Sequence, residues 1–365
     1  MAHLFDSLAI RGITLANRVA VSPMCEYSSV DGFANDWHLV HLGSRAVGGA
    51  GLVFTEATAV TPEGRISPED LGIWKDAHIE FLTRIVKFVK SQGAAPGMQL
   101  AHAGRKGSTW RPWSGYGAIP VKDGGWVPVA PSDVAYSDDY PKPAALSVEG
   151  IRGIVEAFRQ AARRAIEAGF RVIEIHAAHG YLLHEFFSPL SNFRKDEYGG
   201  SFENRTRIAR EVATAIREVM PENLPLFIRI SATDWKKGGW DVEQAVELAK
   251  QLAPLGVDLI DCSSAGLVHD QEVVAGPGFQ APFAARIRRD AKIMTSAVGL
   301  IETKEQVEDI LAKDGADLVF MAREYLRDPY WLLRTARELK QTMSWPVQYL
   351  RAAPAESPAR KPFEG

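Results

Sequence analysis

Short runs rich in valine, isoleucine and leucine recur along the chain, separated by longer stretches with helical periodicity. Eight such runs are present, and we expect each to form a strand. They begin at Val19, Gly51, Pro96, Val172, Pro225, Val257, Lys292 and Asp317. The runs are apolar throughout rather than alternating, which is typical of strands in a parallel sheet that is covered on both faces.

Helical periodicity is clearest between these runs. It covers residues 76–92, 147–168, 204–219, 241–253, 303–313 and 329–340. Ser147, Asp241 and Thr303 stand where N-cap residues belong. Repeated strand–helix units in one chain favour a closed (β/α)8 TIM barrel, an α/β fold, over an open doubly wound sheet.

The connection after the third predicted strand is unusually long. Residues 104–146 are rich in glycine, proline, tryptophan and tyrosine, which predicts an ordered cap over the barrel. We therefore expect a single domain over residues 1–351, with this capping insertion after strand 3. The tail, residues 352–365, reads AAPAESPARKPFEG and is expected to be disordered.

Composition and charge narrow the functional classes. A formal net charge of −3, with no long basic run, argues against a nucleic-acid partner. The N-terminus lacks the features of a secretory signal, and no stretch reaches the roughly 18 apolar residues of a membrane helix, so we expect a cytoplasmic protein. The two cysteines, Cys25 and Cys262, are too few for an iron–sulfur cluster or a four-cysteine zinc site.

In a barrel of this kind the active site lies at the carboxyl ends of the strands. The residues that follow the apolar runs are therefore the candidates, and they are Cys25, Tyr27, Glu56, Ala57, Gln99, His102, His176, His179, Tyr181, Arg229, Gly299 and Arg323. Gly299 and Arg323 follow the last two strands, where such barrels commonly hold a phosphate. A turn glycine and a surface arginine are an equally good interpretation of that pair.

Two histidines, His176 and His179, allow three interpretations. A zinc site would need further ligands, and only His184 is near, so we expect no metal. Hydrogen bonding of both rings within the strand end is the simpler structural interpretation. The functional interpretation is that paired imidazole N–H groups hold a substrate oxygen while Tyr181 supplies a proton.

Arg229 lies in an otherwise apolar run, LFIRIS. Its permanent charge requires either a buried carboxylate partner or an electron-rich ligand, such as the N1 edge of a flavin. A GxGxxA string at residues 276–281 is a weak dinucleotide signal because it does not directly follow a strand. A nicotinamide would therefore act as a transient substrate.

Several segments together resemble one known family. The strongest is HAAHGYLLHEFFSPLSNFRKDEYGGSFENR at residues 176–205, supported by NRVAVSPMCEYS, GGAGLVFTEATAV, GMQLAHAGRK and DLVFMAREYLRDP. Over nearly its whole length the chain is similar to the Old Yellow Enzyme family of FMN-dependent ene-reductases, in the thermophilic-like branch with xenobiotic reductases and NADPH dehydrogenases. The resemblance implies tightly bound, non-covalent FMN, with NADPH or NADH as the hydride donor.

The resemblance also implies which residues contact FMN. Ser22, Pro23, Met24 and Cys25 would line the flavin, with the Cys25 sulfur tuning its redox potential. Ala57 and Gln99 would contact the pyrimidine side and Arg229 the N1 edge. Gly299, Ala322 and Arg323 would hold the phosphate, although many relatives have glycine in place of Ala322.

For the substrate, the resemblance implies that His176 and His179 bind a carbonyl or nitro oxygen, Tyr181 protonates the α-carbon and Tyr27 closes the pocket. Arg351 would reach a neighbouring subunit's pocket, which implies a homodimer or a dimer of dimers. The implied reaction is ping-pong hydride transfer through flavin N5 to enones, enals, maleimides or nitro compounds. The alternatives are a non-catalytic FMN-binding protein and a phosphate-binding aldolase or isomerase barrel, for which we find no lysine at a strand end.

Overall fold

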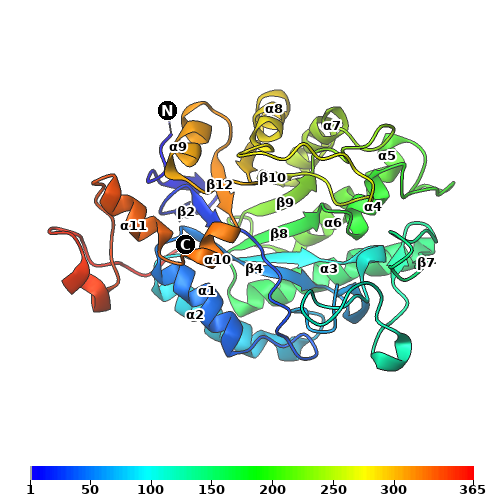
Figure 1. The fold of residues 1–365 in the computed structure, drawn as a ribbon, viewed down its shortest axis with the longest axis horizontal. Helices are drawn as coiled ribbons and strands as arrows, with labels where there is room; N and C mark the ends of the chain where they lie inside the picture. The colour runs from blue at the N-terminus through cyan, green and yellow to red at the C-terminus, as the bar shows by residue number, and fades with distance from the viewer. Residues whose placement is uncertain (1) are drawn as a thin grey trace.

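A closed barrel of parallel strands forms the centre of the computed structural model, which describes residues 2–365 (Figure 1). The strand order is β10-β11-β12-β3-β4-β5-β8-β9. The strands are β3 (Val19–Val21), β4 (Leu52–Ala59), β5 (Ala95–Ala101), β8 (Val172–Ala177), β9 (Leu226–Ser231), β10 (Leu259–Ser263), β11 (Met294–Ala297) and β12 (Leu318–Met321). Each strand overlaps one of the eight predicted runs; β5 starts one residue before its run and β4 ends two residues after its run. The TIM barrel prediction is therefore confirmed.

Helices surround the barrel. The longer ones are α1 (Asp36–Val47), α2 (Ile79–Ser91), α3 (Val148–Ala168), α6 (Arg207–Val219), α7 (Val242–Leu252), α8 (Ala281–Ala291), α9 (Lys304–Ala312) and α11 (Trp331–Glu338), and the shorter ones are α4 (Leu182–Phe187), α5 (Phe202–Arg205) and α10 (Arg323–Arg327). Ser147, Asp241 and Thr303 each cap a helix through the side chain, as predicted.

Helices α1 and α8 were not among the predicted helical stretches. In α1 the polar residues His38, His41 and Arg45 face inward and are buried, which breaks the apolar periodicity. Helix α8 has a proline in its first turn and only two buried residues, Ala284 and Ile287. Both helices therefore lack the stripe of large apolar residues on which the prediction depended.

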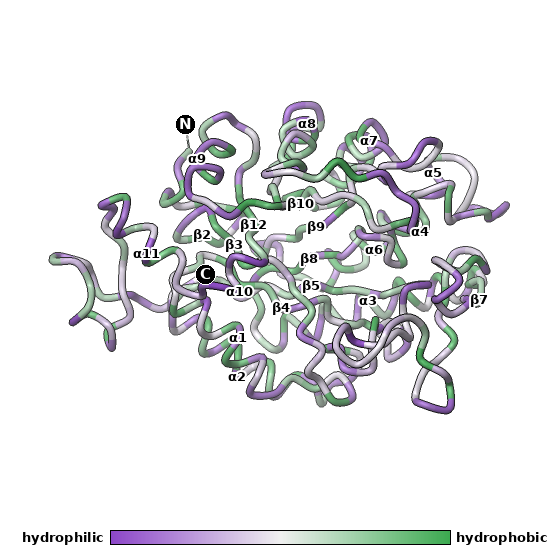
Figure 2. Tube along the Cα trace, viewed as in Figure 1, coloured by the Kyte–Doolittle hydropathy of each residue, from purple (hydrophilic) through white to green (hydrophobic). Residues whose placement is uncertain are grey.

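Apolar side chains fill the barrel interior and the layer beneath the helices. Figure 2 shows green segments concentrated along central strands such as β10 and β12, and purple segments on the outer helices and loops. The ring of Phe54 lies 5.6 Å from that of Phe320 and 6.3 Å from that of Phe227, centroid to centroid. The interior is thus a packed core, and a ligand must bind at the rim.

A hairpin formed by β1 (Leu8–Ile10) and β2 (Ile13–Leu15) precedes the first barrel strand. Its turn donates a backbone hydrogen bond from Gly12 to Asn223 O, 2.9 Å away, just before β9 begins. The hairpin therefore covers the amino-terminal end of the barrel, opposite the predicted active site.

Residues 104–146 form an ordered insertion after β5. The insertion contains the short helices η3 (Gly104–Lys106) and η4 (Val121–Asp123) and the strands β6 (Val129–Ala130) and β7 (Ala144–Ala145). We call residues 104–146 the cap. Trp126 ties it to the barrel by donating its indole N–H to Glu63 O, 2.9 Å away.

The expectation of disorder for residues 352–365 is wrong. After α11 the chain makes an excursion through η6 (Val347–Ala352) and returns to the barrel, seen in red in Figure 1. A parallel bridge between Trp345 and Ala359 closes the base of this excursion. The half-buried Arg360 and Phe363 then anchor the tail.

Arg360 donates to Ala46 O at 2.9 Å and Val47 O at 2.8 Å, at the end of α1, and to Ser344 O at 2.8 Å. Phe363 packs against the core, and its backbone N–H donates to Lys90 O. Two anchoring side chains thus order a segment whose average composition predicts disorder.

None of the helices in residues 2–365 combines the length and the apolar character needed to cross a bilayer.

Candidate active site

Arg229 is the charged centre of the site. Its register in β9 places it beside His176 of β8 and Asp261 of β10, and all three are buried. The guanidinium Nε pairs with the Asp261 carboxylate, and Nη2 donates to Ser22 Oγ at 3.1 Å. Glu174 Oε1 lies 3.8 Å from Nε. The buried ion pair considered for Arg229 is therefore present.

These charges determine the ionisation of the barrel floor. Burial opposes the charge of Arg229, but Asp261 and Glu174 raise its pKa above the ordinary value. Burial and the nearby Asp261 raise the pKa of Glu174 to about 8, so this carboxyl is protonated at neutral pH. The Arg229–Asp261 pair therefore carries no net charge, but the Arg229 guanidinium lines the cavity at the rim and presents a fixed cation there.

A cavity of about 250 Å³ opens above this cation. The barrel closure brings together residues that are far apart in sequence, and the lining includes Ser22, His179, Arg229, Gly299, Ala322 and Arg323. The residues predicted for the phosphate and for the flavin ring edge thus share one cavity.

The cavity has a cradle for an anion at the ends of β11 and β12. Gly299 has φ = 118°, and a Cβ there would lie 2.5 Å from Gln280 Nε2, so glycine is required. Among residues 2–365, the backbone N–H groups of Gly299 and Arg323 donate to no protein acceptor, and the exposed Arg323 guanidinium has no ion-pair partner. Free N–H groups beside a free cation fit a phosphate monoester.

Gln280 supports this cradle and was not identified from the sequence. Its amide donates to Val298 O at 2.8 Å and accepts from Ser264 Oγ. The weak GxGxxA string contains Gln280, and Gly278 in that string donates to Gly299 O. The GxGxxA string thus stabilises the turn after β11 through hydrogen bonds. The spacing of its glycines in the sequence does not indicate this role.

The remaining residues predicted for FMN lie near the same rim. Ala57 of β4 and Gln99 of β5 are register partners, and the Gln99 amide donates to Glu174 Oε1 at 2.7 Å. Pro23, Met24 and Cys25 follow β3 and are half-buried. Burial and the carboxyls of Asp70 and Glu56 raise the pKa of the Cys25 thiol, which therefore stays protonated.

His176, His179 and Tyr181 gather at the end of β8. The ring of His176 lies 5.1 Å from that of His179 and 5.0 Å from that of Tyr181, both nearly perpendicular to it. His179 has φ = 59° and is held by a hydrogen bond from its backbone N–H to Ser231 Oγ. The strained turn thus aims a second imidazole at the space beside the first.

Hydrogen bonding indicates which nitrogen of His176 carries the proton. Its Nδ1 accepts the backbone N–H of Ala178 at 3.3 Å, while its Nε2 has no partner within the described residues. Burial, then the charges around it, lowers the pKa of His176 well below its ordinary value. The ring is therefore neutral with its proton on Nε2, which makes it a free donor.

His179 and Tyr181 are also uncharged. One ring nitrogen of His179 contacts Ser263 Oγ at 2.7 Å, and burial and Arg229 lower the pKa of this histidine. Burial raises the pKa of Tyr181 well above its ordinary value. Two neutral imidazoles and a phenol that keeps its proton are thus placed side by side.

The cap covers the site from both sides. Trp113 packs edge-on against Tyr27, with ring centroids 5.8 Å apart. On the other side Lys106 Nζ lies 5.0 Å from the ring centroid of Tyr181. Lys106 is not a strand-end lysine in the sequence because it follows the last residue of β5, Ala101, by five positions, and η3 brings it back to the rim.

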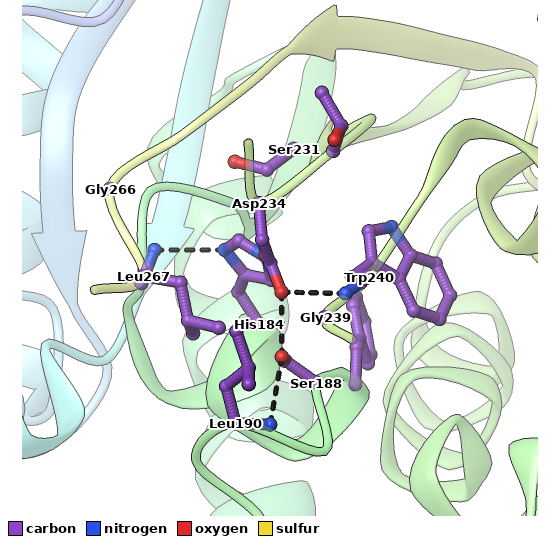
Figure 3. Close-up of polar contacts among 12 residues, drawn as sticks. His184, Ser188, Leu190, Ser231, Asp234, Gly239, Trp240, Gly266 and Leu267 are labelled. Atoms are coloured by element: carbon purple, nitrogen blue, oxygen red, sulfur yellow. Dashed lines mark hydrogen bonds and ion pairs between the residues drawn. The ribbon is translucent and has the colours of Figure 1, made fainter. Parts of the chain in front are cut away.

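His184 has a different environment from the other two histidines. Figure 3 shows the Asp234 carboxylate between Ser188 and the backbone N–H of Trp240, with His184 beside it. His184 Nε2 donates to Asp234 Oδ1 at 2.8 Å, and Nδ1 accepts from the Gly180 backbone N–H at 2.9 Å. Every polar atom of this ring is used, so His184 supports the turn that carries His179 and Tyr181.

Two further predictions concern metals and Arg351. No group of three or more histidine, cysteine, aspartate or glutamate side chains within residues 2–365 is arranged to hold a metal ion. Arg351 is exposed in η6, on the excursion that projects away from its own barrel, and it does not line the cavity.

A TIM barrel with an anion cradle, a buried cation and neutral hydrogen-bond donors around one rim cavity fits a phosphorylated ligand. Residues 3–342 match the family described as NADH:flavin oxidoreductase / NADH oxidase. The chain belongs to this family and is an FMN-dependent NAD(P)H oxidoreductase.

Three relatives illustrate the similarity. The chain is 49% identical over 350 residues to an NADPH dehydrogenase of Geobacillus sp. (strain WCH70), which covers 95% of this chain and 98% of that one. It is 47% identical over 350 residues to the NADPH dehydrogenase of Bacillus subtilis (strain 168), with the same coverage. It also resembles the solved structure of morphinone reductase in complex with tetrahydroNAD, at 29% identity and a TM-score of 0.76, over 95% of this chain and 93% of that one.

Proposed function

We propose that this oxidoreductase is an ene-reductase, which saturates the activated C=C bond of α,β-unsaturated carbonyl compounds. The observation that carries the proposal is the uncharged group of His176, His179 and Tyr181 beside the cavity, in which the ring of His176 lies 5.1 Å from that of His179 and 5.0 Å from that of Tyr181. Neutral donors suit a carbonyl oxygen that gains negative charge during the reaction, and a protonated phenol suits the carbon that must gain a proton.

The residues around the cavity fit FMN. Gly299, Ala322 and Arg323 would hold the phosphate, and Arg229 would face the N1 edge. Ala57 and Gln99 would contact the pyrimidine side, and Ser22, Pro23, Met24 and Cys25 would line the ring. When bound, FMN accepts a hydride from NADPH or NADH and returns it to the substrate's β-carbon.

The side chains of the protein would perform the other steps. The Nε2–H of His176 and one ring nitrogen of His179 would donate to the substrate oxygen, which polarises the double bond. Tyr181 would give its phenolic proton to the α-carbon. Tyr27, held beneath Trp113 of the cap, would close the pocket and exclude water.

The same donors suit nitro groups, so the proposed substrates are enones, enals, maleimides and nitro compounds. One cavity serves both the nicotinamide and the alkene, which predicts ping-pong kinetics. Arg351, on its projecting excursion, would contribute to the pocket of a second copy in a homodimer or a dimer of dimers. In such an assembly, each pocket would receive Arg351 from the other copy.

An anaerobic stopped-flow experiment tests the proposal. NADPH should bleach the flavin absorption of the purified protein, and cyclohexenone, N-phenylmaleimide or a nitroalkene should restore it with formation of the saturated product. Parallel runs with NADH establish the preferred donor. If NADPH bleaches the flavin but no activated alkene restores it faster than buffer does, the ene-reductase assignment is wrong while the oxidoreductase class stands.

A further inference from the structure

Lys106 connects three segments of the protein next to the site. Its Nζ donates to His179 O at 2.8 Å, in the turn after β8, and to Gly266 O at 3.1 Å, in the loop after β10. Both acceptors lie in turns of positive φ, at His179 and Gly266. One half-buried ammonium thus holds together two turns of positive φ, of which the one at His179 is strained.

Lys106 is also held between two aromatic rings. Its Nζ lies 4.9 Å from the ring centroid of Tyr136, in the cap, and 5.0 Å from that of Tyr181. Arg105 strengthens the connection, because its guanidinium donates to Val134 O in the cap and to Leu267 O after β10. The ammonium therefore lies where the cap meets the proposed proton donor.

We propose that Lys106 is a positioning residue that fastens the cap to the turn bearing His179 and Tyr181, and that its positive charge favours the phenolate which Tyr181 becomes after protonating the substrate. The second part rests on the proposed function. In that step the Tyr181 proton goes to the substrate's α-carbon, and the electron pair of the O–H bond stays on oxygen. A nearby cation stabilises this anion until water returns a proton.

The charge of Lys106 depends on pH within the working range of an enzyme. Burial lowers the pKa of Lys106 to about 8, and Arg105 adds to that effect while Glu185 opposes it. The groups that face the ammonium are Arg105 and Glu185, Tyr136 from the cap, and His179 and Tyr181 from the β8 turn. The two tyrosines keep their protons because burial raises their pKa values. The cation is thus present at neutral pH and is lost as the pH rises through about 8.

The first test concerns activity and its pH profile in the FMN-loaded enzyme. K106M should slow reoxidation of the reduced flavin by an enone at least tenfold at pH 7 and leave flavin reduction by NADPH within about twofold. K106R keeps a charge at all pH values and should restore most of the rate. Wild-type reoxidation should fall above pH 8, and this decline should be absent from K106R.

A matched variant separates Lys106 from its acidic neighbour. Glu185 is buried beside it, and burial raises the pKa of Glu185 to about 8 as well. E185Q removes that titration and should shift the decline in rate to lower pH, since Glu185 raises the pKa of Lys106. If the decline in reoxidation rate above pH 8 vanishes in E185Q but persists in K106R, the titrating group is Glu185. That result would overturn the proposal that the charge of Lys106 stabilises the Tyr181 phenolate.

The second test does not depend on catalysis. Trypsin should cut after Lys122, which is exposed in η4 of the cap, several-fold faster in K106M than in wild type. Y136L should do the same because it removes the ring on the cap side. Unchanged cleavage in both variants would overturn the positioning role.

Failure of the proposed function is distinguishable from failure of this inference. A wild-type protein that reduces no activated alkene rejects the ene-reductase, whereas the cleavage rates still decide whether Lys106 fastens the cap. If the wild-type enzyme reduces enones and K106M matches it in both half-reaction rates and in the rate of tryptic cleavage, only the proposed role of Lys106 is rejected.

Discussion

His176 and His184 lie on one short segment of chain but have opposite surroundings. Both nitrogens of His184 are engaged within the protein, by the Gly180 backbone and by Asp234. His176 spends one nitrogen on the Ala178 backbone and leaves Nε2 without a partner among the described residues. Unused hydrogen-bonding capacity, rather than residue type or motif, therefore separates a candidate ligand from a supporting residue.

Substitutions at these two kinds of residue should therefore differ in whether they lower the stability of the fold or the interaction with the substrate. Removing a fully engaged group leaves several buried partners unsatisfied and lowers the free energy of unfolding. Removing a group with a free donor costs little stability and removes an interaction with the substrate. The experiments below use this contrast, in order of decreasing effect.

D234A is expected to have the largest effect, on stability. It leaves the His184 ring, the Ser188 hydroxyl and the Trp240 backbone N–H without an acceptor, and all are buried. The free energy of unfolding should fall by about 3–5 kcal/mol, measured by urea denaturation at a fixed excess of FMN. D270A, which breaks an exposed ion pair with Lys236, should leave the free energy of unfolding nearly unchanged. Equal losses in the two variants would contradict the contrast.

H176A should affect chemistry more than stability. Loss of one donor to the developing negative charge should slow enone reduction by the reduced enzyme about 10²–10³-fold. FMN content should stay at the wild-type level, and the loss of unfolding free energy should be smaller than in D234A. H3A, in an exposed position, is the control. Wild-type affinity for a phenol ligand in both H176A and H179A would refute the assigned role.

Y181F tests the proton donor. Without the phenolic proton, the oxidative half-reaction should slow about 100-fold while flavin reduction by NADPH stays nearly unchanged. Stopped-flow absorbance of the flavin measures both rates. Y116F, in an exposed part of the cap, should leave both rates alone. Parallel slowing of the two half-reactions would indicate a misplaced flavin instead of a missing proton.

E185Q should have the smallest effect, visible in the pH dependence of stability. The pKa of Glu185 is raised to about 8, so the folded state keeps a proton that the unfolded state releases above about 4.5. Stability is therefore lost as pH rises toward 8. E185Q should remove this contribution and gain roughly 1–2 kcal/mol on wild type between pH 6.5 and 8, by urea denaturation. A constant difference across that range would count against the shift.

The barrel could be predicted from the sequence because strands that are buried on both faces have continuous apolar sequences. Helices α1 and α8 were not predicted because their apolar periodicity is interrupted, by buried polar residues in α1 and by a proline in α8. Candidates at the strand ends could be found because the barrel topology places all eight ends on one rim. Their roles as ligands remain predictions.

Residues whose importance depends on distant partners could not be found in this way. Lys106 lies beyond the end of its strand, and Gln280 lies in a string that resembles a poor nucleotide motif. His184 resembles a metal ligand until Asp234, fifty residues later in the chain, comes beside it. The order of residues 352–365 could not be predicted for the same reason, because the carbonyls that Arg360 binds belong to α1 and to Ser344.

That tail has a practical consequence for handling the protein. Gly365, the last residue, lies against Phe363 and Ile13, at the closed end of the barrel. A purification tag fused there would emerge beside the hairpin, whereas removal of residues 352–365 would leave the carbonyls of Ala46, Val47 and Ser344 without the guanidinium of Arg360. Tagging at the amino terminus, with every residue to Gly365 kept, is the safer design.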